Sequence, residues 1–264
     1  MPCTHCLRPL LRTACGLLLA AAACGAAAQA VRVVTEITPY TFDESGTQSG
    51  PATKLVRATL ERAGISDYRL DVYPWARAYD KALGEPGVLI YLIARTPERE
   101  PLFQWAAEVI RTQYHLYRLA ERNDIGVGSL ADARRYTIGV VRDDLRHQYL
   151  QQHGFTRVTV SAQQQDNVRR LLARQVDLVP LTEVDARQQC RNRQPQCSGL
   201  VRVLTLDELT TQLYMAYSRG TPAALVERTR DAFEQLRAEG AVHRAFAGLP
   251  GTVVSDPAPP KRKP

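Results

Sequence analysis

The chain has 264 residues, of which 45% are hydrophobic and 23% charged, a composition typical of a globular protein with one large domain or two modest ones. Its formal net charge is +7, but the basic residues are dispersed and aromatic residues make up only 7%, a combination that argues against a nucleic-acid-binding surface. No apolar run after residue 30 is long enough to span a membrane.

Residues 1–30 have the pattern of a secretory signal peptide, which would direct the protein to the periplasm. A positive start, an apolar centre and a small-residue cleavage pattern follow one another at Arg8 and Arg12, residues 17–23 and residues 28–30. The mature chain is therefore expected to begin at Val31. An alternative is lipoprotein processing at Cys24, which follows two small residues.

Only two cysteines lie beyond residue 30, Cys190 and Cys197, and they bracket the hydrophilic segment RNRQPQ. In an oxidising compartment such a close pair predicts a disulfide-closed loop, with two free thiols as the alternative. A metal site would need further ligands close by in the sequence, and none is present. We expect neither a metal nor a cofactor.

Strand and helix patterns alternate from residue 31 onward. Runs of β-branched and apolar residues predict strands, and apolar residues at helical spacing predict helices. The predicted strands are 31–37, 68–73 and 87–94, and the predicted helices are 51–63 and 75–83. Because strands and helices alternate, a parallel α/β sheet is expected.

A short polar elbow follows the wholly apolar strand 87–94. Thr96 has the chemistry of a helix cap and Pro97 suits a first helical position, which puts Arg99 in the first turn of a helix. A guanidinium there can hold a carboxylate or phosphate with two bonds. The alternative is a surface ion pair with Glu98 or Glu100.

A second α/β unit is expected after an extended segment that ends at residue 119. Its predicted elements are a short helix starting within 129–133, strands at 136–141, 157–160 and 176–181, a helix capped by Asp143 or Asp144 that reaches His153, and a helix from its cap Asp166 to Arg174. The chain then predicts a strand at 213–217 and a helix with Thr221 as N-cap and Pro222 as its first residue. Residues 256–264 are proline-rich and basic, so we expect a disordered tail.

Six segments, taken in order, resemble the family-3 periplasmic solute-binding proteins, the receptors of ABC importers for amino acids and other small polar solutes. They are VRVVTEITPY, PWARA, RTPERE, YTIGVVRDD, LLARQVDLVP and TPAALVERTRDAFEQLRAEGAVHRAF. The resemblance implies an α/β fold of two lobes joined by a hinge, each a mostly parallel sheet flanked by helices. It implies lobe 1 at 31–113, lobe 2 at 114–218 and a return to lobe 1 at 219–255.

The resemblance also implies which residues meet the solute in the cleft between the lobes. Arg99 matches the arginine that clasps the ligand α-carboxylate, with Thr96 in the same elbow. Tyr40 lies near the aromatic residue that covers the ligand, and Arg142 and Asp143 lie in the lobe 2 loop that meets it. Tyr40 has an alternative as an ordinary loop aromatic, and Asp143 as a helix cap.

Thr182 occupies the position where amino-acid receptors carry the acid that pairs with the ligand ammonium, and Glu183 stands beside it. A buried ammonium without a carboxylate partner is costly, so the sequence favours a standard α-amino acid no more than an anionic or polar solute without that ammonium. We expect a small polar, carboxylate-bearing solute. Trp75 could stack on the ligand and Arg77 could reach the cleft. The alternative for Trp75 is packing in the core.

The sequence gives little support for an enzyme, because it contains no phosphate-binding glycine loop, no His-Glu-x-x-His motif and no Gly-x-Ser-x-Gly motif. A few members of this fold are periplasmic dehydratases of cyclic acids, in which Glu183 or Glu36 would transfer the proton; Glu36 could equally be a solvated strand-end charge. A third possibility is a sensory module. The expected function is solute binding without catalysis, by a monomer that hands its ligand to an ABC permease.

Overall fold

The computed structural model describes residues 30–42, 45, 47–191 and 199–256. Residues 1–29 of the predicted signal peptide, including Cys24, lie outside these residues, as do Cys197 and the tail from residue 257 onward. The cleavage site, the lipidation alternative and the disulfide therefore stay predictions. Within the described residues, no helix combines the length and apolar character needed to cross a membrane.

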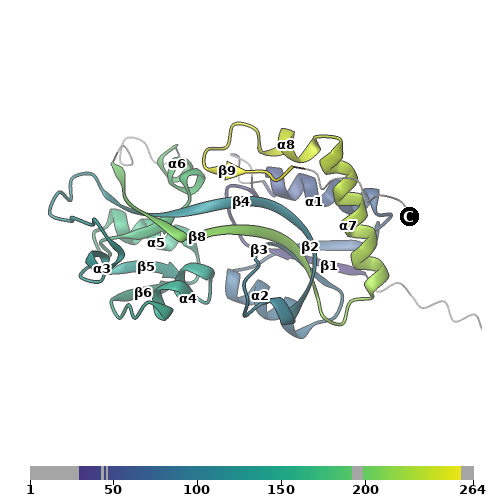
Figure 1. The fold of residues 1–264 in the computed structure, drawn as a ribbon, viewed down its shortest axis with the longest axis horizontal. Coiled ribbons are helices and arrows are strands. Elements are labelled where there is room, and N and C mark those ends of the chain that lie inside the picture. The colour runs from purple at the N-terminus through teal and green to yellow at the C-terminus, as the bar shows by residue number, and fades with distance from the viewer. Residues whose placement is uncertain (1–29, 43–44, 46, 192–198, 257–264) are drawn as a thin grey trace, which may run out of the picture.

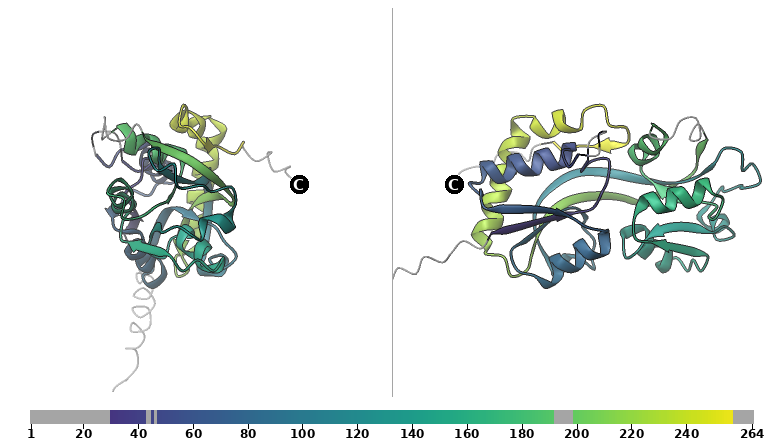
Figure 2. Two further views of the ribbon diagram at one scale, coloured as in Figure 1. Left: turned by 90° about the vertical axis from the view of Figure 1, so that its left-hand side faces the viewer. Right: turned by 180° about the vertical axis from the view of Figure 1, so that it is seen from behind.

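Two long antiparallel strands, β4 (Phe103–Leu119) and β8 (Leu200–Ser218), run through both halves of the molecule (Figure 1). Their pairing extends from Phe103 opposite Ser218 to Leu119 opposite Leu200. The view from behind in Figure 2 shows two bodies joined by this curved ribbon. We call the body that contains both the first described strand and the last helix lobe 1, and the other lobe 2.

Lobe 1 is a sheet with helices on both faces. Its strands β1 (Val31–Thr35), β2 (Tyr68–Val72) and β3 (Val88–Ala94) pair in parallel in the order β2-β1-β3, and β8 then joins β3 antiparallel. The helices α1 (Pro51–Arg62), α7 (Ala223–Ala238) and α8 (Ala241–Phe246) cover one face, and α2 (Trp75–Gly84) covers the other (Figure 1). The short strand β9 (Thr252–Val253) adds to β4.

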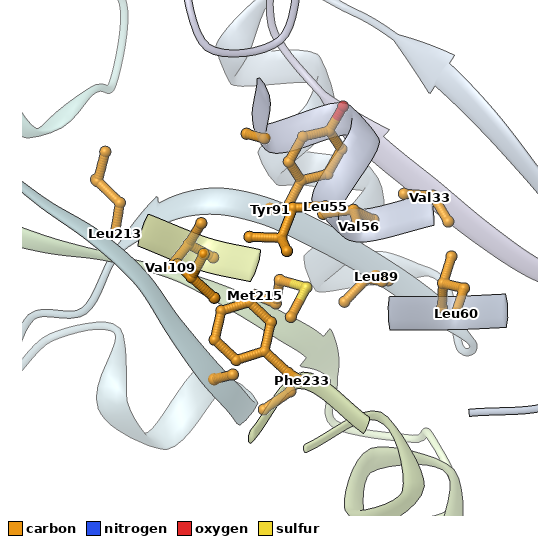
Figure 3. Packing of buried hydrophobic residues seen from close by; sticks show 14 of the residues in the cluster. Val33, Leu55, Val56, Leu60, Leu89, Tyr91, Val109, Leu213, Met215 and Phe233 are labelled. Atoms are coloured by element: carbon orange, nitrogen blue, oxygen red, sulfur yellow. The ribbon is translucent and has the colours of Figure 1, made fainter. Parts of the chain in front are cut away.

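The main core of lobe 1 lies between this sheet and helices α1 and α7 (Figure 3). Leu89 and Tyr91 of β3 meet Leu60 of α1 and Phe233 of α7 there, and all four side chains are almost fully buried. Burial of side chains of this size supplies most of the driving force for folding.

The strand β3 contains a β-bulge at Leu92, whose φ is +62°. The bulge reverses the alternation of the strand, so Ile93 packs on the α2 side together with Ile90. Leu92 itself is left facing the gap between the lobes. Such a backbone conformation is unfavourable for leucine, and bulges of this kind occur often beside functional sites.

Lobe 2 is smaller. The strands β5 (Ile138–Val141) and β6 (Val158–Ser161) form a parallel pair, and β7 (Val179–Leu181) pairs antiparallel with β4. A parallel bridge between Ile138 and Leu178 connects β5 to the segment that leads into β7. Its helices are α3 (Leu130–Ala133), α4 (Leu145–Gln152), α5 (Gln164–Leu172) and α6 (Glu183–Arg191).

The predicted elements form in the expected order, with four corrections, while α6, α8 and β9 were not predicted. The elbow after β3 forms a turn and the three-residue 3₁₀ helix η1 (Glu100–Leu102) instead of an α-helix. The reason is that Pro101 has no backbone N–H to continue a helix and the Leu102 N–H donates to Arg99 O, three residues back, after which the chain enters β4. The other corrections concern the caps of α5 and α7 and the extent of β8.

Asp166 lies in the first turn of α5, and Gln163 is the N-cap. Pro222 is the N-cap of α7, because Thr221 is drawn into a hydrogen bond of 3.1 Å with Ser218 Oγ. The strand predicted at 213–217 is only the end of β8, and those five residues pair with β3. The chain therefore returns to lobe 1 before residue 218.

We predict that Phe233→Ala lowers the free energy of unfolding by about 3–5 kcal/mol, because it leaves a cavity in the core beside Met215 (Figure 3). Urea denaturation measures the change. Leu83→Ala is the matched control, since Leu83 is exposed and its truncation should cost less than about 0.5 kcal/mol. Equal losses for the two variants would contradict the core assignment.

Candidate functional site

A small cavity of about 50 Å³ lies between the two lobes. Lobe 1 contributes Glu36 and Tyr40 from the loop after β1, together with the bulge residue Leu92. Lobe 2 contributes Arg146 of α4, and Thr182 and Asp185 at the start of α6; Tyr114 of β4 lies in the ribbon between them. The cavity thus lies beyond the carboxyl ends of the strands, where open α/β sheets usually bind ligands.

Arg146 is the buried cation of this cavity, with an exposed fraction of 6%. Its Nε donates to Asp144 Oδ2 at 2.6 Å, its Nη1 donates to Pro180 O at 3.4 Å, and its guanidinium lies 5.2 Å from the centre of the Tyr114 ring. Burial acts to lower the pKa of Arg146, but the Asp144 carboxylate raises it overall. Asp144 also caps α4 by accepting the His147 N–H at 2.8 Å.

Asp185 is an acid of the cavity that the sequence analysis missed. One of its oxygens, Oδ2, accepts the backbone N–H of Thr182 at 3.2 Å and the Thr182 hydroxyl at 2.8 Å, while the Asp185 N–H donates back to Thr182 Oγ1 at 3.1 Å. Burial raises the pKa of Asp185. The sequence Thr-Glu-Val-Asp has the spacing of a helix capping box, and this signal could have located the acid.

Glu36 brings a second carboxylate to the cavity, from the lobe 1 side. It is half-buried, and its side chain makes no hydrogen bond to any described residue. Burial raises the pKa of Glu36 to about 7, although Arg146 across the cavity acts to lower it. Glu36 is therefore not a solvated strand-end charge.

Arg99 does not line the cavity; it connects the lobes beside it. With 2% of its surface exposed, it lies 5.2 Å from the centre of the Trp75 ring and 5.1 Å from that of Tyr79. Its Nη2 donates across the gap to Asp143 O at 3.4 Å, and Trp75 Nε1 donates to the same oxygen at 3.0 Å. Burial lowers the pKa of Arg99, and its Nε has no partner among the described residues.

Arg99 does not form the surface ion pair with Glu98 or Glu100 that was considered above. Glu98 is exposed, and Glu100 is paired with Arg95 at 2.6 Å. Thr96 holds the turn, since its carbonyl oxygen accepts the Arg99 N–H at 3.0 Å. Arg99 is thus left to the aromatic rings and to lobe 2.

The remaining predicted site residues lie outside the cavity as far as the described chain shows. Arg77 is exposed and lies over the Tyr73 ring at 4.8 Å, and the side chains of Arg142 and Asp143 are exposed. Glu183 pairs with Arg187 at 2.8 Å. Of the ten predicted residues, the structure brings three into the cavity lining, namely Glu36, Tyr40 and Thr182. Trp75 packs in the core against Tyr79 and also reaches the lobe 2 carbonyl.

A wider, open hollow of about 500 Å³ lies where α6 meets the loops of lobe 1. Among the described residues that line it, Lys54 and Arg187 are the charged ones, and Arg187 is neutralised by Glu183. Charged groups converge in the inner cavity instead, which is therefore the candidate site. Among the described residues, no group of three or more His, Cys, Asp or Glu side chains is placed to hold a metal ion.

Comparisons with known proteins identify the fold. No family model matches the chain, and no curated protein matches it. Solved structures do match. A histidine kinase sensor domain with similarity to periplasmic binding proteins shares 18% identity, with a TM-score of 0.74 over 86% of this chain and 98% of that one.

An ancestral arginine-binding protein bound to arginine shares 16% identity, with a TM-score of 0.72 over 84% of this chain and 98% of that one. The arginine-, lysine-, histidine-binding protein ArtJ from Geobacillus stearothermophilus also shares 16%, with a TM-score of 0.71 over 85% and 96%. The predicted two-lobed α/β fold of periplasmic binding proteins is confirmed.

We predict that Glu36 makes the protein less stable as the pH rises. The folded pKa of about 7 lies above the ordinary value of 4.5, so the folded state holds this proton more tightly than the unfolded state does. The resulting stabilisation is complete below pH 4.5 and is lost as the pH rises through 7.

Urea unfolding at pH 5 and pH 8 tests this point. The wild type should lose free energy of unfolding between pH 5 and pH 8, and Glu36→Gln should make that loss smaller by about 1–2 kcal/mol, allowing for the partial exposure of the side chain. Glu98→Gln, at an exposed position, is the control and should leave the loss unchanged. The same pH dependence in wild type and Glu36→Gln would show that this carboxyl is not buried as described.

Proposed function

We propose that the protein is a periplasmic solute-binding protein that encloses a small polar solute between its lobes and presents it to the permease of an ABC importer. The observation that carries this proposal is the enclosed cavity, to which both lobes contribute half-buried or buried charged groups. A solute in that cavity would contact both lobes at once, so its binding energy would favour the closed arrangement.

The charges of the cavity favour a solute with a protonated amine. Arg146, the one cation among the described residues that line the cavity, is already paired with Asp144, whereas Glu36 and Asp185 face the cavity without a described cation of their own. Burying carboxylates in this way is costly, and a bound ammonium group would compensate them. A carboxylate on the solute would meet Arg146.

The presence of Asp185 changes the expectation drawn from Thr182. The carboxylate that can pair with an ammonium group belongs to Asp185, about one helical turn after Thr182, and the Thr182 hydroxyl donates a hydrogen bond to it. The structurally similar proteins support an amine-bearing solute, since they include one bound to arginine and one bound to glutamine. At identities of 16–18% these comparisons show the fold alone, so the main argument for the solute comes from the cavity.

Native mass spectrometry of the freshly exported protein tests the proposal directly, by identifying any small molecule that co-purifies. Isothermal titration calorimetry then compares L-glutamine with glutaramate, which lacks only the α-amino group. We expect the amine-bearing compound to bind at least tenfold more tightly and to be recovered unchanged after prolonged incubation. Tighter binding of glutaramate would contradict the amine assignment, and consumption of the compound would indicate an enzyme.

We predict that Asp185→Asn weakens the binding of an amine-bearing solute at least tenfold, because it removes the carboxylate that compensates the ammonium group. A tenfold change corresponds to about 1.4 kcal/mol. Asp80→Asn, an exposed change on α2, is the control. Unchanged affinity of Asp185→Asn for L-glutamine and L-arginine would remove Asp185 from the site.

We predict that Arg99→Ala also weakens binding by at least about tenfold, but by the same factor for every solute. Arg99 contacts the backbone of lobe 2, so its loss destabilises the closed arrangement whatever the cavity holds. Arg95→Ala, in the same elbow, should have little effect. Small-angle X-ray scattering with saturating solute should show a larger radius of gyration for Arg99→Ala, and loss of affinity for only one class of solute would argue for direct contact instead.

A further inference from the structure

A second cavity, of about 70 Å³, adjoins the first. It lies between the end of β2, with Tyr73, and the start of α5, where three glutamines follow one another at 163–165. Glu36, Ile37 and Gln164 line both cavities, so the two cavities meet at these residues. A solute that projects past them would pass from the first cavity into the second.

Gln164 is the residue at this junction that lacks partners. Both polar atoms of its amide, Oε1 and Nε2, are buried and have no hydrogen-bond partner among the described residues. Buried amides are nearly always hydrogen-bonded in folded proteins, and leaving both atoms unpaired is costly. An amide offers donors and an acceptor together, so it pairs best with a group that does the same.

The walls of the second cavity carry little charge beyond the shared Glu36. The other polar side chains that line it are the glutamines and Tyr73. The cations nearest to Tyr73 in the described chain, Arg77 and Lys81, lie over its ring at 4.8 and 5.4 Å and do not line the cavity. A cationic end group there would find only Glu36 as an opposite charge, and an anionic end group would find no cation among the described lining residues. An apolar end group would leave Gln164 unpaired.

We propose that the second cavity is a subsite for the far end of the solute, and that this end is a neutral group with both a hydrogen-bond donor and an acceptor, such as a carboxamide or ureido group, held by Gln164. The inference rests on the proposed function, because it takes the amine-bearing end of the same solute to lie in the first cavity. Sites that hydrogen-bond a ligand group discriminate strongly against analogues that lack it.

Two pairs of nearly isosteric probes test the subsite by calorimetry. L-Glutamine and L-glutamate differ in a carboxamide against a carboxylate, and L-citrulline and L-arginine differ in a ureido group against a guanidinium. In at least one pair the wild type should prefer the neutral member by tenfold or more. Gln164→Leu should reduce that preference to less than threefold, whereas Gln164→Asn, which keeps the amide, should retain part of it.

Gln151→Leu, an exposed change on α4, is the matched control and should leave the preference unchanged. Thermal unfolding of each variant identifies any loss of the fold. If the wild type binds the amine-bearing probes but prefers the charged member of both pairs, or if Gln164→Leu keeps the full preference, the subsite is wrong while the proposed function stands. If none of the four probes binds, and a co-purified solute has neither a carboxamide nor a ureido end, the subsite is likewise overturned.

Discussion

The pairing of β4 with β8 is the constraint on which the rest of the structure depends. The two strands share backbone hydrogen bonds along both lobes, so the lobes can move relative to each other only as this ribbon bends. The register of the ribbon shifts at four places, and the largest shift lies near its middle. Between the Thr112–Thr211 and Tyr114–Leu206 pairs, a single residue of β4, Gln113, stands opposite four residues of β8.

This irregularity coincides with the candidate site. The amide of Gln113 spans it by donating to Asp207 Oδ1 at 3.2 Å and to Thr210 Oγ1 at 3.1 Å. Thr112 and Tyr114, on either side, both line the cavity. A change in the bend of the ribbon would therefore move the walls of the cavity directly, which couples solute binding to the arrangement of the lobes.

The sequence predicted the fold well because its signals are local. The apolar strand at residues 87–94, the spacing of α1 and the periodicity of α7 each reflect one buried face, and each element formed as expected. Helix caps were less accurate, since a competing hydrogen bond from Ser218 was enough to displace Thr221. The length of β8 could not be predicted from sequence, because the mostly polar residues 207–212 interrupt its apolar pattern and its pairing is with β4, which is distant in the chain.

The candidate site was predicted only in part, because it depends on distances between lobes. Glu36, Tyr40 and Thr182, which line the cavity, were named in advance through the resemblance to solute-binding proteins and their dehydratase relatives. Arg99 was recognised as important, but its place between two aromatic rings, facing the backbone of lobe 2, depends on α2 and on a loop 44 residues away. Arg146 and Asp185 are both in helices, where sequence alone assigns charged residues to the solvent.

The contact made by Trp75 and Arg99 has a consequence for how this protein can diverge. Both donors come from lobe 1, but their shared acceptor is a main-chain carbonyl at position 143, where φ is +57°. A carbonyl oxygen is supplied by any residue that tolerates this backbone, which in practice means glycine, asparagine or aspartate. We therefore expect position 143 to accept any of these three residues during evolution, and substitutions of Trp75 and Arg99 to be restricted, since their side chains supply the donors.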